Sequence, residues 1–564
     1  MPMPFPFRRR EQPSPPQPAP PSPADALAAI LAYHQATKHH QHRYAAGPGE
    51  LDWATQPDPF RRYRGAPLIS LDHPPPPASV TGAVPTWSDI LTRGVTPAAP
   101  VDRASVSQLL FDSLSLSAWK RSGTSRWSLR VNPSSGNLHP VEGYVAAGPI
   151  VGLWDEPTLA HYAPEEHALE LRAVVPAELA SRLWAALPPG SWIAGLSAIH
   201  WREAWKYGER AFRYSQHDTG HALAALAIAA AGLGWRCALA DSASSAEMAR
   251  LLGIWTQRGV EAEHAQTLLL LHPPLAPAPG REGDPEAFAR CEELRWQGEP
   301  NELSPGHVDW GRIDSAEAWT RKPRTPPWPA LDLGPAPEPD RGSPALRALV
   351  RQRRSAVDFD GRASIASEAF FRALARTLPS SAAPWGALPW LPRVDLVLFV
   401  HRVEGLPGGL YLLLRDPGRE PRLREACRRD FDWARPEGCP AGLALVRLRA
   451  GDVRSLARSV SCHQEIAADG CFAAAMLAEL RPSLETNGAW FYRHLHWEAG
   501  FVGQILYLEA EAAGLRATGM GCFFDDALHA VLGLATLDFQ SLYHFTVGGA
   551  VEDPRLTTEP AYVE

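Results

Sequence analysis

Lysine is almost absent from this chain of 564 residues. Only four lysines occur among the 55 basic residues, which leaves 51 arginines. Such a bias usually reflects genome composition, but it makes each lysine informative, because a lysine side chain can lose its proton and an arginine cannot. The formal net charge is −7. The chain therefore lacks the excess of positive charge that favours nucleic-acid binding, and no nucleic-acid partner is expected.

Long apolar runs and paired cysteines are also missing. The longest purely apolar stretch, Ala222–Leu233, is shorter than the roughly 20 residues that a membrane-spanning helix needs, so no membrane partner is expected. Arg8-Arg9-Arg10 is not expected to begin an export signal, because the prolyl segment after it has no apolar core. Seven cysteines, none in a CxxC pair, argue against a disulfide framework and a zinc ribbon. We expect reduced, mostly buried thiols and a cytoplasmic location.

Proline is abundant, with 56 residues, and it divides the chain. Residues 1–24 are Pro-rich without an apolar period, which predicts a disordered tail. A second Pro-rich segment, residues 321–344, is interpreted as a linker. The predicted domains are therefore residues 25–320 and residues 345–564.

The two halves resemble each other when the numbering of one is shifted by a constant offset of 280. Without a gap, this offset superimposes Gly208 on Gly488, Gly220 on Gly500, Leu252-Gly253 on Leu532-Gly533, and Pro274 on Pro554. A period this long indicates two copies of one domain rather than a solenoid, and hence a pseudo-dimer within one chain.

The apolar pattern predicts long helices mixed with short strands. Residues 217–233 and 498–515 are Ala- and Leu-rich and apolar on almost every side, which is typical of buried central helices. Each ends near a glycine that can cap it, Gly234 or Gly514. The predicted strands are Gly143–Ala147, Ala265–Leu271, Val394–Val400, Leu443–Leu448 and Tyr543–Val547. The combination favours an α+β fold.

Two polar clusters suit a negatively charged cofactor. In Pro133-Ser134-Ser135-Gly136-Asn137, a turn-forming segment, hydroxyls, an amide and backbone N–H groups can contact a polar ring edge or an anion. Arg353-Arg354-Ser355 offers two guanidinium groups and a hydroxyl to a phosphate monoester. Taken alone, the first cluster is an ordinary loop and the second a solvated helix end.

Two glycine-containing segments add to these clusters. Gly519-Met520-Gly521 would let the backbone approach a flat ligand closely, although the chain has no GxGxxG dinucleotide-binding fingerprint. Trp205-Lys206-Tyr207-Gly208 places one of the four lysines in a turn ahead of the first central helix.

Two histidine-containing segments imitate metal motifs. His217 and His221 are four positions apart, as in the HExxH zinc motif, but Asp218 replaces the glutamate and no third ligand follows, so no metal is expected. Lys38-His39-His40-Gln41-His42 has no carboxylate or thiol nearby in the sequence, and we interpret it as surface or substrate-path chemistry.

Together these segments resemble the flavin-dependent nitroreductase superfamily, and within it the SagB-type branch that includes azoline dehydrogenases. The resemblance covers residues ~30–560. Pro133-Ser134-Ser135-Gly136-Asn137 resembles the superfamily's loop against FMN, and Arg353-Arg354-Ser355 its phosphate clamp. Gly519 and Gly521 resemble the glycines near the isoalloxazine ring, and Arg555 a C-terminal basic residue that also holds the phosphate. Lys206-Tyr207 resembles the pair to which azoline dehydrogenases attribute proton removal, and the choice between the two residues stays open.

The resemblance implies two nitroreductase-like domains that bind FMN between them. Ordinary members are homodimers with two FMN sites, each built from both chains. At the offset of 280, the first half has His73 opposite Arg353 and Leu275 opposite Arg555, while the second half has no equivalent of the Ser-Ser-Gly-Asn loop. We therefore predict one FMN per chain and, because no second chain is needed to complete that site, a monomer.

Three functions are compatible with this reading. The favoured one is dehydrogenation of a peptide-derived or small heterocyclic substrate in a biosynthetic pathway with partner proteins. The second is reduction of a nitro compound or quinone with NAD(P)H as donor. The third is a flavin-free scaffold or peptide-binding partner, which the retained cofactor motifs argue against.

Overall fold

The computed structural model describes residues 22–75, 84–92, 95–185, 187, 190–274, 283–334, 340 and 342–562. Most of the predicted N-terminal tail and part of the predicted linker lie outside these residues. Helix α1 (Pro23–Ala36) begins inside the segment predicted to be disordered, because Ser22 caps it and proline is well tolerated in a first helical turn. Among the described residues, no helix is long and apolar enough to cross a membrane.

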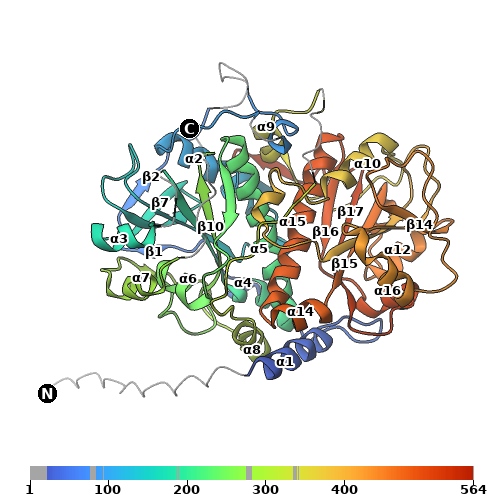
Figure 1. The fold of residues 1–564 in the computed structure, drawn as a ribbon, viewed down its shortest axis with the longest axis horizontal. Coiled ribbons are helices and arrows are strands. Elements are labelled where there is room, and N and C mark those ends of the chain that lie inside the picture. The colour runs from blue at the N-terminus through green and yellow to red at the C-terminus, as the bar shows by residue number, and fades with distance from the viewer. Residues whose placement is uncertain are drawn as a thin grey trace.

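Two lobes, each built around an antiparallel sheet, lie side by side (Figure 1). The first sheet has the order β2-β7-β6-β5-β8-β10-β9, with strands Leu68–Ser70, Ala168–Val174, Thr158–Ala163, Val141–Ala147, Trp192–Ala198, His264–His272 and Arg236–Leu239. The second has the order β14-β13-β12-β15-β17-β16, with strands Leu445–Ala450, Gly409–Leu413, Val394–Val400, Phe472–Glu479, Phe539–Gly548 and Arg516–Met520. All five predicted strands fall on these elements.

The same strand order in both sheets confirms a duplicated α+β fold. Replacing β5 to β10 by β12 to β17 converts one order into the other, and β2 is an additional edge strand of the first sheet. Helices flank both sheets. In the first half they are α2 (Arg103–Phe111), α3 (Ala177–Leu183), α4 (His200–Tyr207), α6 (Ser245–Leu251), α7 (Pro285–Arg290) and α8 (Gly311–Trp319). In the second half they are α9 (Leu346–Gln352), α10 (Ser367–Arg376), α11 (Glu420–Ala426), α12 (Arg454–Val460), α13 (Ile466–Asp469), α14 (Arg481–Asn487) and α16 (Asp525–Leu532).

Two long helices, α5 (Ala211–Gly232) and α15 (Phe491–Ala512), pack against each other between the lobes (Figure 1). Both are buried along almost their whole length, as predicted. Each begins well before its predicted start. The reason is that their first turns carry polar side chains that are nevertheless buried, because partners elsewhere satisfy them; Arg213, for example, pairs with Asp525 at 2.8 Å.

The offset of 280 holds only in the middle of each half. It relates α5 to α15 position by position. At β10 the offset fails. Leu271 pairs with Trp192 in the first sheet, just as Val547 pairs with Phe472 in the second, but the numbers of Leu271 and Val547 differ by less than 280. The predicted match of Pro274 with Pro554 is therefore wrong, since the loop before β10 is longer than the loop before β17. Leu275, which was compared with Arg555, lies outside the described residues.

Upstream of the central helices the offset is smaller still. Val141 pairs with Ala198 in the first sheet, just as Val394 pairs with Ala478 in the second. Val141 therefore corresponds to Val394 in the alignment of the two halves. The comparison of His73 with Arg353 is therefore also wrong. No Arg-Arg-Ser sequence occurs in the first half of the chain.

Two matched glycines lie where the central helices cross. A Cβ atom on Gly220 would overlap the backbone of Trp497, and one on Gly500 would overlap the carbonyl of His217 and lie 3.1 Å from the Cα of Gly220. The helices approach this closely only because neither residue has a side chain. The offset of 280 had already paired these two glycines.

Gly500→Ala is expected to destabilise the folded protein by about 1–3 kcal/mol, because the new methyl group meets backbone atoms that cannot move independently. The effect has the opposite sign to the gain of about 1 kcal/mol that alanine brings to an unconstrained helix. The measurement is the urea unfolding midpoint. Gly311→Ala in α8, where a Cβ would meet nothing within 4 Å, is the matched control. An unchanged midpoint for Gly500→Ala would contradict the close crossing.

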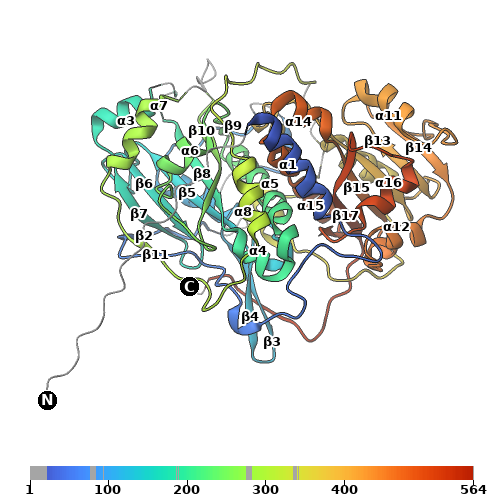
Figure 2. The same ribbon diagram turned by 90° about the horizontal axis from the view of Figure 1, so that it is seen from below.

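Each half extends an arm onto the other half. The N-terminal helix α1 lies against α14 (Figure 2), and His34 Nδ1 and the Tyr492 hydroxyl are 3.1 Å apart. In return, the C-terminal strand β18 (Thr557–Glu559) pairs with β3 (Leu116–Ser122), which forms a hairpin with β4 (Ser125–Arg130). A small sheet of β1 (Tyr63–Arg64) and β11 (Glu299–Pro300) completes the first half. The C-terminal arm thereby brings Leu556 and Thr558 to the wall of a cavity between the halves.

Candidate functional site

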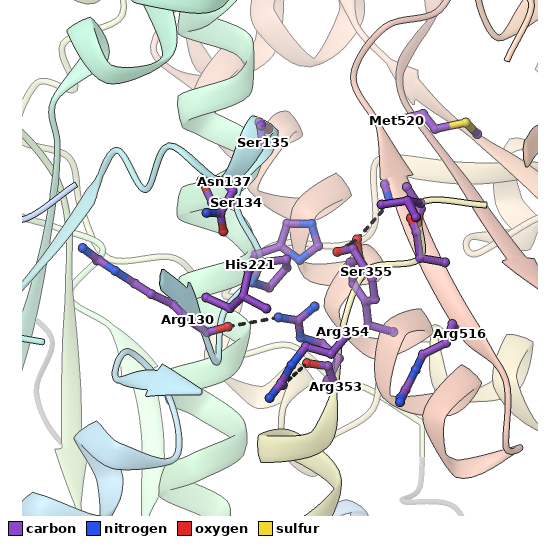
Figure 3. A pocket seen from close by; sticks show the side chains of 18 of the residues that line it. Arg130, Ser134, Ser135, Asn137, His221, Arg353, Arg354, Ser355, Arg516 and Met520 are labelled. Atoms are coloured by element: carbon purple, nitrogen blue, oxygen red, sulfur yellow. Dashed lines mark hydrogen bonds between the residues drawn. The ribbon is translucent and has the colours of Figure 1, made fainter. Parts of the chain in front are cut away.

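A cavity of about 730 Å³ lies between the two halves, a size that suits a cofactor or drug-sized ligand. Residues of both halves line it. In Figure 3, Ser134, Ser135 and Asn137 come from the first half, Arg353, Arg354 and Ser355 come from the second, and His221 of α5 lies between them. The fold thus brings the Pro133–Asn137 cluster and the Arg353-Arg354-Ser355 cluster, which come from opposite halves of the sequence, into one site.

The loop Pro133–Asn137 forms one wall, and Asp218 of α5 holds it in place. The Asp218 carboxylate accepts hydrogen bonds from the Ser134 hydroxyl at 2.6 Å, the Ser135 hydroxyl at 2.9 Å and the Ser135 backbone N–H at 3.1 Å. Gly136 and Asn137 adopt φ values of 58° and 61°, a region that favours glycine and asparagine. The loop therefore turns where its sequence permits a turn, but a side chain from a different element fixes it.

Asp218 and Glu203 are two buried carboxyls behind this loop. Burial raises the pKa of Asp218 to about 6 even though it accepts several hydrogen bonds. Burial, followed by the neighbouring Asp218, raises the pKa of Glu203 well above its ordinary value. Two interacting carboxyls of this kind do not both ionise readily, so the pair retains a proton near neutral pH.

The histidines around Asp218 are not arranged as a zinc site. His221 contacts the Gln504 carbonyl oxygen and the Tyr543 hydroxyl, each at 3.2 Å, and the His217 ring stacks on Tyr543 with centroids 4.3 Å apart. Within the described ranges, no group of three or more His, Cys, Asp or Glu residues is placed to hold a metal ion. The His-Asp-x-x-His sequence instead supplies the carboxylate that anchors the loop.

The opposite end of the cavity is basic. Arg353 is buried and donates to the carbonyls of Val131 and Arg130 at 3.1 Å each, which leaves its Nη1 buried with no partner. Burial, together with the charges of Arg353 and Arg516, lowers the pKa of Arg354 to about 10. Guanidinium groups that share one wall repel each other, and an anion placed between them would relieve this repulsion.

Gly519 and Gly521 line the cavity, and tyrosine side chains pack against both of them. A Cβ atom on Gly519 would overlap the Tyr543 hydroxyl, and one on Gly521 would overlap the Tyr214 ring. The glycines are therefore required by tyrosines packed against them. Tyr507 links this segment to the basic end, because its hydroxyl accepts from the Gly519 N–H at 3.0 Å and lies 2.9 Å from the Ser355 hydroxyl.

Comparison with known proteins identifies the family. A family model described as the nitroreductase family matches residues 92–261 and 409–549, which together make up more than half of the chain. This chain belongs to the nitroreductase family. Among solved structures, a nitroreductase from Anabaena variabilis has a TM-score of 0.67 and 22% sequence identity, covering 93% of this chain and 99% of that one. This likeness shows the same fold over both halves.

Other solved structures match about one half of this nitroreductase. One from Ralstonia eutropha covers 41% of this chain and 96% of its own, with 20% identity and a TM-score of 0.27. A chain of the E. coli microcin synthetase complex covers 44% of this chain and 93% of its own, with 14% identity and a TM-score of 0.25. No curated protein matches the chain.

Lys206 and Tyr207 end helix α4 beside the loop wall of the nitroreductase site. A Cβ atom on Gly136 would lie 2.5 Å from the Tyr207 hydroxyl and 3.2 Å from the Lys206 ammonium nitrogen, so both side chains lie directly against the loop. Tyr207 also lines the cavity. Gly208 allows the chain to turn into α5 here, because its φ is 55° and a Cβ atom would overlap the backbone of Ala46.

Ten of the twelve predicted site residues line the cavity, and Lys206 lies directly beside it. Arg555 is the exception. Its side chain is 82% exposed and pairs with Asp553 at 2.7 Å. Arg516, which lines the cavity and pairs with Glu511, occupies the basic end instead. Sequence reasoning missed Arg516, although its position shortly before Gly519 is a signal that could have found it.

The segment Lys38–His42, interpreted from the sequence as surface or substrate-path chemistry, is buried at its start and exposed at Gln41 and His42. Lys38 and His39 are buried. Lys38 pairs with Asp526 at 2.7 Å, and the His39 backbone N–H donates to the Asp525 carboxylate at 2.9 Å. The sequence around Lys38 shows no carboxylate because its partners come from α16, in the other half of the chain.

The position related to the cavity by the duplication is filled with side chains. Glu498 of α15 corresponds to Asp218 at the offset of 280, but it accepts from the Trp390 indole at 3.2 Å and from the Arg393 backbone at 3.0 Å. Phe501 corresponds to His221, and its ring lies 4.9 Å from that of Trp385. Residues 385–390 thus place two tryptophans where the first half has its Ser-Ser-Gly-Asn loop.

Proposed function

We propose that this nitroreductase is an FMN-dependent oxidoreductase that dehydrogenates a peptide-derived or small heterocyclic substrate, as the SagB-type resemblance suggests. The family assignment supports a flavin oxidoreductase at the level of the family. The observation that carries the finer proposal is the position of Lys206 and Tyr207, which lie together against the loop wall of a cavity whose other end is basic.

The residues present fit FMN. Arg353, Arg354 and Arg516 would hold the phosphate, since one buried guanidinium nitrogen of Arg353 has no partner, and burial lowers the pKa of both Arg353 and Arg354. Ser134, Ser135 and Asn137 would face the polar edge of the ring system. Bound FMN would supply hydride transfer, and the protein would supply orientation and the accompanying proton transfer.

The proton acceptor in this proposal is Lys206 rather than Tyr207. Burial, followed by the nearby Glu203 carboxyl, raises the pKa of Tyr207 well above its ordinary value, so its hydroxyl stays protonated at neutral pH and acts as a hydrogen-bond donor. Lys206 lies about one helical turn from Glu203 on α4. In this proposal Lys206 accepts the proton that the substrate loses, and the Tyr207 hydroxyl orients the substrate beside it.

The proposal is tested with the full-length protein reconstituted with FMN. The protein is mixed anaerobically with a short peptide that contains a thiazoline or oxazoline ring. The expected result is loss of the oxidised-flavin absorbance together with a product lighter by two hydrogen atoms. If instead only NAD(P)H reduces the flavin and a nitro compound or quinone reoxidises it, the nicotinamide-dependent alternative replaces this proposal.

One FMN per chain is the expected stoichiometry, because Trp385 and Trp390 occupy the pseudo-equivalent position. The measurement is flavin released by denaturation, divided by protein concentration, after saturation with FMN and removal of the excess. A ratio near one is predicted. A ratio near two would mean that the tryptophans move aside and that the second position binds flavin as well.

A further inference from the structure

Cys462 and Cys522 bring two thiols together at the edge of the cavity. Cys522 lines the cavity directly after Gly521, and Cys462 follows α12 on a neighbouring loop. The two thiols lie close enough for each to shift the pKa of the other, and the Phe524 backbone N–H donates to the Val460 carbonyl at 2.8 Å between the same two segments. Gln464 Nε2 also donates to the Cys522 carbonyl at 2.8 Å, which holds the two segments in contact. Both cysteines are half-buried, so small molecules can reach them.

The backbone at Cys462 is held in an uncommon conformation. Cys462 and His463 have φ values of 54° and 60°, although neither is glycine. Non-glycine residues in this region cost conformational energy and persist only where surrounding contacts impose them. The uncommon conformation thus falls on the residue whose thiol interacts with Cys522.

The surroundings of Cys522 favour its thiolate. The backbone N–H of Ala45 donates to His39 Nδ1 at 3.0 Å, which leaves the ring proton on Nε2 for the hydrogen bond between His39 and Cys522. Arg210 donates to the carbonyl of the adjacent Gly521 at 3.1 Å and adds a nearby positive charge. The hydrogen bond from Cys462, then that from His39, lowers the pKa of Cys522 below its ordinary value.

The same contact acts in the opposite direction on Cys462. The hydrogen bond with Cys522, together with burial, raises the pKa of the Cys462 thiol. The remaining titratable groups that face the pair are Tyr44, Tyr207, Tyr214 and Asp525. Asp525 is neutralised by its pairs with Arg210 and Arg213. Cys522 is thus the nucleophile of the pair, and Cys462 keeps its proton beside it.

The other five cysteines have no such environment. Cys291, Cys427 and Cys471 are buried, and Cys237 and Cys439 are half-buried. Burial raises the pKa of each of these thiols. The expectation of mostly buried thiols therefore holds for three of seven, and only the 462–522 pair combines exposure with a thiol partner.

We propose that Cys522 and Cys462 form a redox-active pair that reacts with small-molecule disulfides. The Cys522 thiolate attacks one sulfur of the disulfide, forms a mixed disulfide and releases one thiolate. Cys462 then loses its proton and attacks the Cys522 sulfur, which forms the Cys462–Cys522 bond and releases the second thiolate. Two protein thiols are oxidised and one small disulfide is reduced to two thiols, so atoms and electrons balance without any cofactor.

The pair also stands at the wall of the cavity. A Cys462–Cys522 bond would tie the segment that contains Gln464 to the segment that contains Gly521, and both segments line the cavity. Oxidation would therefore set the shape of this wall. The reaction itself needs neither flavin nor substrate, so its test is independent of the proposed function.

The experiment exposes the reduced full-length protein to oxidised glutathione, blocks the remaining thiols with iodoacetamide, and maps the peptides by mass spectrometry. The expected product is a cross-linked peptide containing Cys462 and Cys522. In Cys462→Ser, glutathione should remain attached to Cys522, since the resolving thiol is missing. In Cys522→Ser, no disulfide should form at Cys462. Absence of the cross-link in the parent protein would overturn the proposal.

A second measurement does not depend on the variants folding. Near pH 6, iodoacetamide should modify Cys522 of the parent protein about tenfold or more faster than Cys439, which is also half-buried but has no thiol partner. The difference should narrow as the pH rises and Cys439 ionises. Equal rates for the two cysteines near pH 6 would overturn the proposed reactivity of Cys522.

Discussion

Lys206→Arg is expected to slow substrate-driven flavin reduction by about 10²–10⁴-fold while FMN stays bound, because loss of a general base has an effect of this size. Arginine keeps the positive charge beside the Pro133–Asn137 loop, but it cannot take up the substrate proton. The measurement is the rate of flavin reduction under anaerobic conditions, after flavin occupancy has been checked in each sample.

Lys120→Arg is the matched control for this variant. Lys120 also lines the cavity, and its ammonium group donates to the Thr558 hydroxyl at 2.7 Å, an interaction that arginine can replace. The control should change the rate no more than a few-fold. If Lys206→Arg reduces its flavin at nearly the parental rate, Lys206 is not the base, and Tyr207→Phe becomes the decisive variant.

Arg354→Ala is expected to weaken FMN binding by about tenfold or more, because a charge-assisted contact to phosphate contributes roughly 1.5–3 kcal/mol. The measurement is a titration of the apoprotein with FMN, in which quenching of the flavin fluorescence reports binding. Riboflavin, which has no phosphate, should bind the parent and the variant equally well. That comparison separates loss of the phosphate contact from a general disturbance of the cavity.

Two further arginine variants sharpen this test. Arg454→Ala removes a guanidinium group that is 54% exposed and paired with Asp452, so it should leave FMN binding unchanged. Arg555→Ala should weaken FMN binding if Arg555 contacts the phosphate, as the sequence resemblance implies. It should leave binding unchanged if Arg555 stays exposed and outside the cavity lining, as in the tertiary structure. Equal weakening in Arg354→Ala and Arg454→Ala would place the phosphate elsewhere.

Local sequence was sufficient to predict part of the duplicated fold. The five predicted strands and both central helices lie on observed elements, and burial of β5, β10, β12 and β17 on both sides leaves a strong apolar pattern. Two short motifs could also be recognised from the sequence. A Ser-Ser-Gly-Asn turn needs residues that accept positive φ, and the Arg-Arg-Ser cluster became informative because it occurs together with the other motifs. The match between Gly220 and Gly500 predicted the pairing of two copies, although not that these glycines form the crossing.

What the sequence could not decide is which distant residues meet. The chain alone determined two copies of an α+β domain, a loop, a basic cluster and a lysine beside a tyrosine. Only the tertiary structure placed Asp218 behind the loop, replaced Arg555 by Arg516 at the basic end, buried Lys38 against Asp526, and joined Cys462 to Cys522. These contacts arise between side chains that are far apart in the chain, and their strength depends on burial, which a linear pattern of residue types does not contain.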